Sequence, residues 1–279
     1  MINANIGGAQ GDSNLLIVGD QVIMIDAGQN KPKYEATVRY LKAFGISRID
    51  HFFISHPDRA YYGGLASIIV SGINVKKVYY HLPVPDTRIS LQARPHYLKY
   101  LDFAKENGSD TIQIDQNFQL DLPNNSSIKV VHVEPDVSVN NGLSLRDMSM
   151  IIRFDTVDSS VLFTGNLGRY LGELLTGRED IKAEFLKMPY PGPGESIPTS
   201  FYKTVAPKYL LAPAPKRQWC GDDGRLAREW SIKSQLPTWV TGTNGNIHVI
   251  WRRDQTVISP QYNDERCKLR EFSNMVIKK

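Results

Sequence analysis

The stretch Ser55-His56-Pro57-Asp58-Arg59-Ala60-Tyr61-Tyr62-Gly63-Gly64 (SHPDRAYYGG) decides the fold and raises the main functional question. It follows residues 50–54 (DHFFI), an almost wholly apolar segment that is expected to form a strand inside a covered sheet. The stretch begins with a histidine and an aspartate and ends with a glycine pair, a pattern typical of metal-binding loops. Its middle, however, holds an arginine, an alanine and two tyrosines, so the loop is either a working metal site or the remains of one.

Composition bounds the class of protein. The chain has 279 residues, of which 41% are hydrophobic, enough to bury the core of one large domain or two small ones. Its net charge of +4 is compatible with an anionic ligand, although an ordinary soluble surface explains it as well. No run approaches the roughly 18 apolar residues that a membrane helix needs, so no membrane partner is expected.

Two further features predict the compartment. The N-terminal residues have no basic start and no apolar signal core, which favours a cytoplasmic location. Cys220 and Cys267 are the two cysteines, and neither lies in a CxxC or CxxH context. They are therefore expected to be free thiols in a reducing compartment.

Hydrophobic patterning predicts strands that alternate with helices. Residues 14–18 and 21–26 are expected to pair as a hairpin through the two-residue loop Gly19-Asp20. Further strands are expected at 50–54, 76–80, 128–133, 148–154, 160–164, 184–188, 207–212 and 247–251, and helices at 32–45, 92–106, 168–176, 197–205 and 223–235. Helices that cover the outer faces of two stacked sheets satisfy this order. The predicted class is therefore α/β, with one domain over 1–259 and a polar C-terminal extension over 260–279.

Seven segments, in order and at fitting separations, carry a family resemblance. They are GAQGDSNLLIVGDQVIMIDAG, LKAFGISRIDHFFISHPD with the GGL that follows it, RDMSMIIRF, SVLFTGN, EFLKMPYPG, VAPKYLLAPAP and TGTNGNIHV. With them the chain resembles the metallo-β-lactamase fold superfamily and, within it, the corresponding domain of the DNA-uptake protein ComEC. The resemblance implies a four-layer αββα sandwich with its site at one edge, between the sheets. It also implies five loop motifs that hold one or two metal ions.

The resemblance assigns the first motifs residue by residue. Asp26 stands where the family has an aspartate that supports the metal loop, and His56 and Asp58 stand at the first two ligand positions. Ala60 stands where an aspartate would bind the second metal, and Tyr61 where a histidine would.

The later motifs also depart from the family pattern. Asp147 or Ser149 falls near the third motif, Asn166 replaces the bridging aspartate of the fourth, and Tyr190 replaces the histidine of the fifth. The amide of Asn166 brings no charge, and the phenol of Tyr190 is neutral near pH 7 because its reference pKa is about 10. A pair of metal ions is not expected to assemble from such residues.

Two interpretations of the remaining donors stay open. In the preferred one, His56 and Asp58 hydrogen-bond each other and cap the loop, so that no cofactor binds. Alternatively, His56, Asp58, Asp147 and Asn166 together offer one imidazole, two carboxylates and an amide oxygen, a set that suits a single Zn²⁺ or Mn²⁺ ion.

Cationic and aromatic residues flank the same positions. They are Arg59, Tyr61, Arg146, Lys187 and Tyr190. Cations can stand where metal ions stood and still attract a phosphate or a carboxylate, and tyrosines add hydrogen bonds. We therefore expect a pseudoenzyme that binds an anionic small molecule or a protein partner at this edge. The alternative is a metal-dependent hydrolase of a phosphodiester or another ester with an atypical single-metal site.

Residues 216–230 (KRQWCGDDGRLAREW) alternate basic and aromatic side chains, a pattern compatible with a nucleic-acid strand. The acidic residues Asp222, Asp223 and Glu229 reduce the net positive charge of this segment. An amphipathic helix capped by Asp222 or Asp223, with Leu226 and Trp230 packed inward, explains the same residues. The helix interpretation is preferred, and support for nucleic acid is weak.

Overall fold

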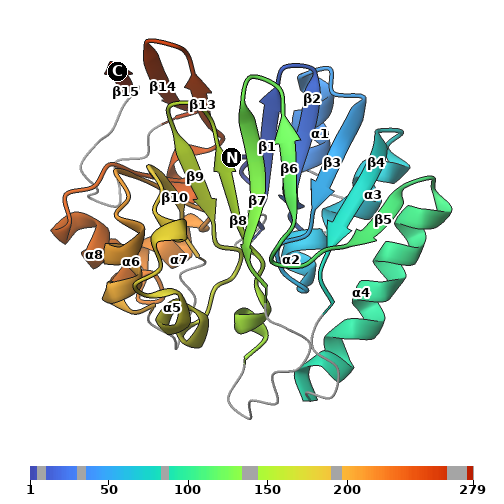
Figure 1. Ribbon diagram of the computed structural model, residues 1–279, viewed down its shortest axis with the longest axis horizontal. Coiled ribbons are helices and arrows are strands. Elements are labelled where there is room, and N and C mark those ends of the chain that lie inside the picture. The colour runs from blue at the N-terminus through green and yellow to red at the C-terminus, as the bar shows by residue number, and fades with distance from the viewer. Residues whose placement is uncertain are drawn as a thin grey trace.

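The structure is a computed structural model that describes residues 1–4, 11–29, 36–82, 88–133, 144–189, 197–262 and 275–278 (Figure 1). A five-stranded sheet has the order β1-β2-β3-β4-β5, and a seven-stranded sheet has the order β12-β11-β10-β9-β8-β7-β6. The strands of the first sheet are β1 (Ser13–Val18), β2 (Gln21–Ala27), β3 (Arg48–Phe53), β4 (Asn74–Tyr80) and β5 (Asp110–Gln113). Those of the second are β6 (Gln119–Leu122), β7 (Ser126–His132), β8 (Ile151–Asp155), β9 (Ser160–Phe163), β10 (Phe185–Lys187), β11 (Tyr209–Ala212) and β12 (Thr238–Val240).

A third, three-stranded sheet has the order β13-β14-β15, with β13 (Ile247–Trp251), β14 (Gln255–Pro260) and β15 (Met275–Lys278). The helices on the side of the five-stranded sheet are α1 (Ala36–Ala43), α2 (Arg59–Tyr62), α3 (Gly64–Val70) and α4 (Arg88–Glu106). On the other side lie α5 (Arg169–Leu175), α6 (Thr199–Val205), α7 (Lys216–Cys220), α8 (Arg225–Lys233) and α9 (Thr241–Asn244), with 3-10 turns at η2 (Leu145–Met148) and η3 (Glu179–Ile181).

Three apolar clusters fill the spaces between four layers. Phe53, Phe154 and Trp239 belong to the central cluster, between the two large sheets. Phe52 belongs to a second cluster, under α1, α3 and α4, and Leu186 to a third, under α5, α6 and α7. Phe52 and Phe53 lie in different clusters because neighbouring side chains of a strand point to opposite faces. Figure 1 shows the same order of layers, so the predicted αββα sandwich of class α/β is confirmed.

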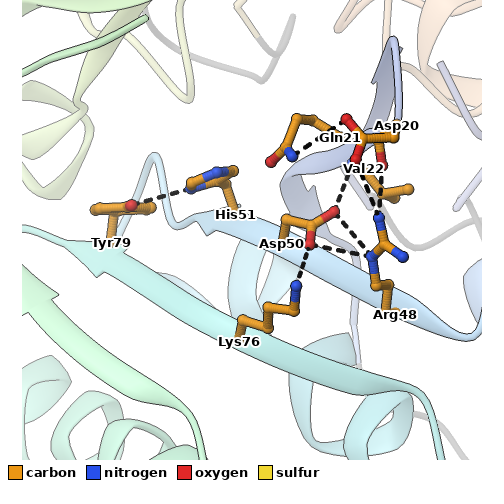
Figure 2. A network of polar contacts seen from close by, with 8 residues as sticks. All are labelled: Asp20, Gln21, Val22, Arg48, Asp50, His51, Lys76 and Tyr79. Atoms are coloured by element: carbon orange, nitrogen blue, oxygen red, sulfur yellow. Dashed lines mark hydrogen bonds and ion pairs between the residues drawn. The ribbon is translucent and has the colours of Figure 1, made fainter. Parts of the chain in front are cut away.

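The hairpin forms as predicted, with Val18 opposite Gln21 and Gly19 at a positive φ of 61°. Parallel pairing continues from β2 through β3 to β4. Near the amino ends of these strands, Asp50 is only 4% exposed and forms hydrogen bonds to residues of all three strands (Figure 2). Its carboxylate accepts hydrogen bonds from Val22 N at 2.9 Å, Lys76 Nζ at 2.7 Å and Arg48 Nε at 3.1 Å. Burial alone would raise the pKa of Asp50, but these hydrogen bonds and the charges of Lys76 and Arg48 hold it below its ordinary value.

Some elements differ from the prediction. Five strands were not predicted, namely β5, β6, β12, β14 and β15, and β15 pairs with β14, so the C-terminal extension contributes a strand. The helix expected at 223–235 is found as α8, but Gly224 precedes it without a side-chain cap. Leu226 is 54% exposed rather than packed inward, whereas Trp230 stacks on Tyr202 with ring centroids 4.2 Å apart.

The cysteines also differ from the prediction. Cys220 is disulfide-bonded, so the expectation of a free thiol is wrong for this residue. The one other cysteine of the chain, Cys267, lies outside the described residues. Disulfides are typical of oxidising compartments, which weighs against the cytoplasmic location expected from the N-terminal residues. No helix in the described part of the chain is long and apolar enough to cross a membrane.

Candidate functional site at the edge of the two large sheets

The site forms where several loops leave the carboxyl ends of parallel strands. His56 follows β3, Asn166 follows β9 and Lys187 ends β10. Parallel strands present their carboxyl ends at one edge of a sheet, so these distant segments converge. Gly165 shows how closely they pack. A Cβ atom there would lie 3.1 Å from Ser55 Oγ and 3.2 Å from Ser149 Cβ, and its φ of +52° also favours glycine.

His56 is buried, with 1% of its surface exposed, and both ring nitrogens have neighbours. Ser149 Oγ donates to the carbonyl of Arg146 at 2.8 Å and lies 3.2 Å from His56 Nδ1. Because the hydroxyl has one hydrogen, it must accept from Nδ1–H, and this assigns the tautomer. His56 Nε2 is then the acceptor and receives the side-chain amide of Asn166 at 3.3 Å.

The charge state of His56 follows from its surroundings. Burial, together with the positive charges of Lys187 and Arg146, lowers the pKa of His56 to about 3. The imidazole is therefore neutral at neutral pH. Tyr61 packs edge-on against it, with ring centroids 4.9 Å apart, and occupies the space beside the ring.

The two carboxylates expected near His56 serve the backbone instead. Asp58 is the N-cap of α2 and accepts from Ala60 N at 2.8 Å. Asp147, only 2% exposed, uses one oxygen for Ser144 N and Oγ, at 2.9 and 2.7 Å, and the other for Leu171 N at 3.1 Å. Capping bonds of this kind satisfy the free N–H groups at helix starts.

Asp26 supports the loop, as the resemblance implies. Its carboxylate accepts from Ser55 N at 2.8 Å and Ser55 Oγ at 2.5 Å. Burial and the nearby charge of Asp12 raise the pKa of Asp26 well above its ordinary value, against the opposing effect of the Ser55 hydrogen bonds and the charge of Lys187. The residue adopts a φ of 64°, which turns the chain sharply at the end of β2.

Lys187 forms an ion pair inside the protein rather than facing a ligand. Its ammonium contacts the carboxylate of Asp12, and the two side chains are 1% and 0% exposed. The ammonium also donates to the carbonyl of Gly165 at 2.9 Å and lies 5.9 Å from the centre of the Tyr61 ring. Lys187 therefore acts from beneath the site, as a fixed positive charge.

The other residues of the expected ligand pocket differ in solvent exposure. Arg59 is exposed, at the start of α2. Arg146 is half-buried in η2, near enough to His56 to lower its pKa. Among the described residues, neither guanidinium has an acidic partner. Tyr190 lies outside the residues that the structure describes.

The donors present do not fit the metal pair that the resemblance implies. In the described ranges, no group of three or more histidine, cysteine, aspartate or glutamate side chains could hold a metal ion. Asp58 and Asp147 are engaged as caps, and His56 Nε2 faces an amide N–H. Both oxygens of Asp147 are engaged, so it could ligate a single ion only by giving up such bonds, whereas Asp58 uses one oxygen as a cap.

Comparisons with known proteins bear on the fold. No protein-family model and no curated protein matches the chain. Among solved structures, a putative metal-dependent hydrolase from Parabacteroides distasonis matches with a TM-score of 0.50 and 11% identity, over 82% of this chain and 89% of that protein. CmlA, a diiron β-hydroxylase from Streptomyces venezuelae, matches with a TM-score of 0.50 and 11% identity, over 82% of this chain and 53% of that protein. A diphosphatase of the PhnP family matches with a TM-score of 0.44 and 14% identity, over 72% of each chain.

At these identities the similarity establishes the fold and no more. The chain has the metallo-β-lactamase fold. The closer resemblance to the ComEC domain stays a prediction.

Sequence reasoning did not single out one residue at the centre of this site, Asp12. A signal was present, because Lys187 stands in the apolar run FLKM and a lysine buried in a strand requires a carboxylate partner. Which carboxylate fills that role depends on how the two sheets stack, and no local pattern encodes it.

Proposed function

We propose that this protein is a non-hydrolytic member of its fold class that binds an anionic group at Arg146, at the edge of the former metal site. The observation that carries the proposal is the engagement of both carboxylates next to His56 as helix caps. The carboxylate oxygens that accept these bonds are held by N–H and O–H donors rather than directed at a metal ion, while Arg146 has no acidic partner among the described residues.

The surroundings of Arg146 support an anionic ligand. A half-buried guanidinium with no acidic partner in the described part of the chain is only partly solvated, which is unfavourable. A phosphate or carboxylate would compensate its charge and accept two parallel hydrogen bonds from the guanidinium. Lys187 is already paired with Asp12 and His56 is neutral, so the positive charge that favours an anion at this edge is that of Arg146.

Replacing Arg146 by alanine should weaken binding of pyrophosphate, the probe ligand, by tenfold or more. A charge-assisted hydrogen bond contributes about 1.5–3 kcal/mol, and about 1.4 kcal/mol corresponds to a factor of ten. Isothermal titration calorimetry at fixed ionic strength measures the change. Arg225→Ala is the matched control, because Arg225 is exposed and pairs with Glu229 on α8. Equal affinities of the two variants for pyrophosphate would contradict an anion site at Arg146.

Metal analysis separates this proposal from the single-metal hydrolase. Protein purified without added metal should contain far less than one zinc or manganese ion per chain by mass spectrometry, because the donors are engaged elsewhere. A phosphodiesterase screen with added Mn²⁺ or Zn²⁺ should give no turnover that a chelator abolishes. Stoichiometric metal that is lost in His56→Ala, together with chelator-sensitive turnover, would instead establish the hydrolase.

A further inference from the structure

A cavity of about 530 Å³ lies between the outer edge of β1 and β13. We call it the β1–β13 slot. Its long walls are residues 15–18 of β1 and 248–251 of β13, and Phe154 of the seven-stranded sheet lies among its lining residues. Figure 1 shows β1 and β13 near the N-terminus, on either side of it.

The first residues of the chain already lie in line with this slot as a short strand. Ile2 N donates to Ser13 O at 2.8 Å, at the start of β1. Met1 N donates to Ile247 O at 2.7 Å, and Ile247 N donates to Met1 O at 2.9 Å. Two residues that exchange both hydrogen bonds form an antiparallel pair. The walls are therefore spaced to hold one extended backbone between them.

Past Met1, the two walls have no partner strand on the side that faces the slot, within the ranges that the structure describes. β1 is the terminal strand of the five-stranded sheet, and β13 that of the three-stranded sheet. The N–H and C=O groups of Val249 and Trp251 point the same way as those of Ile247, because a strand alternates with a period of two. They are free edge groups of the kind that pairs with an added strand.

The side chains around the slot define what would fit it. Leu16 and Val18 of β1 face the central cluster, so Ile17 faces outward, where it is 57% exposed. On the same rim, Phe44, which follows α1, is 54% exposed and Ile250 of β13 is 46% exposed. A strand in the slot would cover these residues on its outer face and meet Phe154 on its inner face. Both faces of the occupant should therefore be apolar.

The charged residues of the slot indicate which end of an added strand should be acidic. The charged side chains that line the slot are Arg252, Arg253 and Asp158, a surplus of positive charge. The two arginines follow β13 at the far end, are exposed, and form no ion pair in the described part of the chain. A strand antiparallel to β13, as Met1 is, places its amino end there. An acidic residue at that end would pair with these arginines.

We propose that the β1–β13 slot binds an extended segment of a partner protein, apolar on both faces and acidic at its amino end. The segment would add a strand antiparallel to both β1 and β13 and would join the five-stranded and three-stranded sheets into one. In this mode of recognition, main-chain hydrogen bonds supply affinity and side-chain pockets supply specificity.

The test uses a capped hexapeptide, a glutamate followed by five β-branched residues, both free in solution and fused directly to the amino group of Met1. Hydrogen exchange followed by NMR should show at least tenfold slower exchange of the amides of Val249 and Trp251 in both cases. A peptide with N-methyl groups on alternate residues should give no slowing, because it cannot donate the same hydrogen bonds.

Two matched variants localise the effect. Ile17→Asp should weaken binding of the free peptide at least tenfold, measured by fluorescence anisotropy of a labelled copy. Val276→Asp should leave it unchanged, since Val276 is similarly exposed, at 54% against 57% for Ile17, but lies on β15 and does not line the slot. Circular dichroism checks that both variants fold.

Three results would overturn the proposal. If the fused strand leaves both amides unprotected, the slot does not accept a strand. If only the fused strand protects them, the slot suits residues of the same chain rather than a partner. If sedimentation shows a dimer that Ile17→Asp dissociates, the occupant is a second copy of this protein.

Discussion

Lys187→Met is expected to lower the free energy of unfolding by about 3–5 kcal/mol, the typical effect of removing one partner of a buried ion pair. The Lys187 ammonium contacts Asp12, and both side chains are almost fully buried. Without it, Asp12 would stay in the interior with no cation. Asp26, whose pKa is already raised by burial and by Asp12, would lose the one charge that favours its ionised form. Urea denaturation followed by fluorescence measures the change.

Two further variants test the cause of this effect. Lys187→Met combined with Asp12→Asn should recover much of the lost stability, because the uncompensated charge is gone and only hydrogen bonds are missing. Lys208→Met removes an exposed ion pair with Glu184 and should lower the free energy of unfolding by less than about 1 kcal/mol. If Lys187→Met had no larger effect than Lys208→Met, the buried pair would not be the support that we infer.

Reduction of the disulfide is expected to lower the free energy of unfolding by about 4 kcal/mol. The chain-entropy model gives this value for a crosslink between cysteines as far apart in sequence as Cys220 and Cys267. Cys220 is disulfide-bonded, and Cys267 is the one other cysteine of the chain. Thermal and urea unfolding with and without dithiothreitol measure the difference.

The control for this experiment is Cys220→Ser, which should resemble the reduced protein and should not respond to dithiothreitol. Thiol titration of the unreduced, denatured protein should find no free thiol. Two titratable thiols in protein isolated without reductant would contradict the crosslink and restore the original expectation of a reducing compartment.

The sequence predicts the fold well because the fold depends on local patterns. Residues 52–54 are apolar and buried, and Phe52 and Phe53 pack into apolar clusters on opposite faces of the sheet. Short strands such as β12 and β15 were not predicted, because three or four residues carry too little periodicity. The short helix α7, which precedes the predicted helix at 223–235, was likewise not predicted.

The site was predicted less completely than the fold. The motif positions predicted that His56 and Asp58 lie on one loop after a strand, as they do in the structure, whereas the loss of the metal site stays a prediction from residue types. The hydrogen-bond and ion-pair partners of the site residues could not be predicted, because Ser149, Leu171 and Asp12 come close to them only when the two sheets stack. Lys187 and Arg146 were expected to act alike, yet one is buried against an aspartate and the other is half-buried without a partner.

The positive φ of Asp26 limits what can replace it. A residue other than glycine in the left-handed region carries backbone strain of about 1–3 kcal/mol, and asparagine and aspartate tolerate it best. The two hydrogen bonds from Ser55 hold this conformation in place. Few other residues can therefore end β2 without relaxing the turn, and such a relaxation would move the chain that carries His56 and Asp58. The backbone conformation of the loop that carries His56 and Asp58 is thus held by the turn at Asp26 and does not need a bound ion.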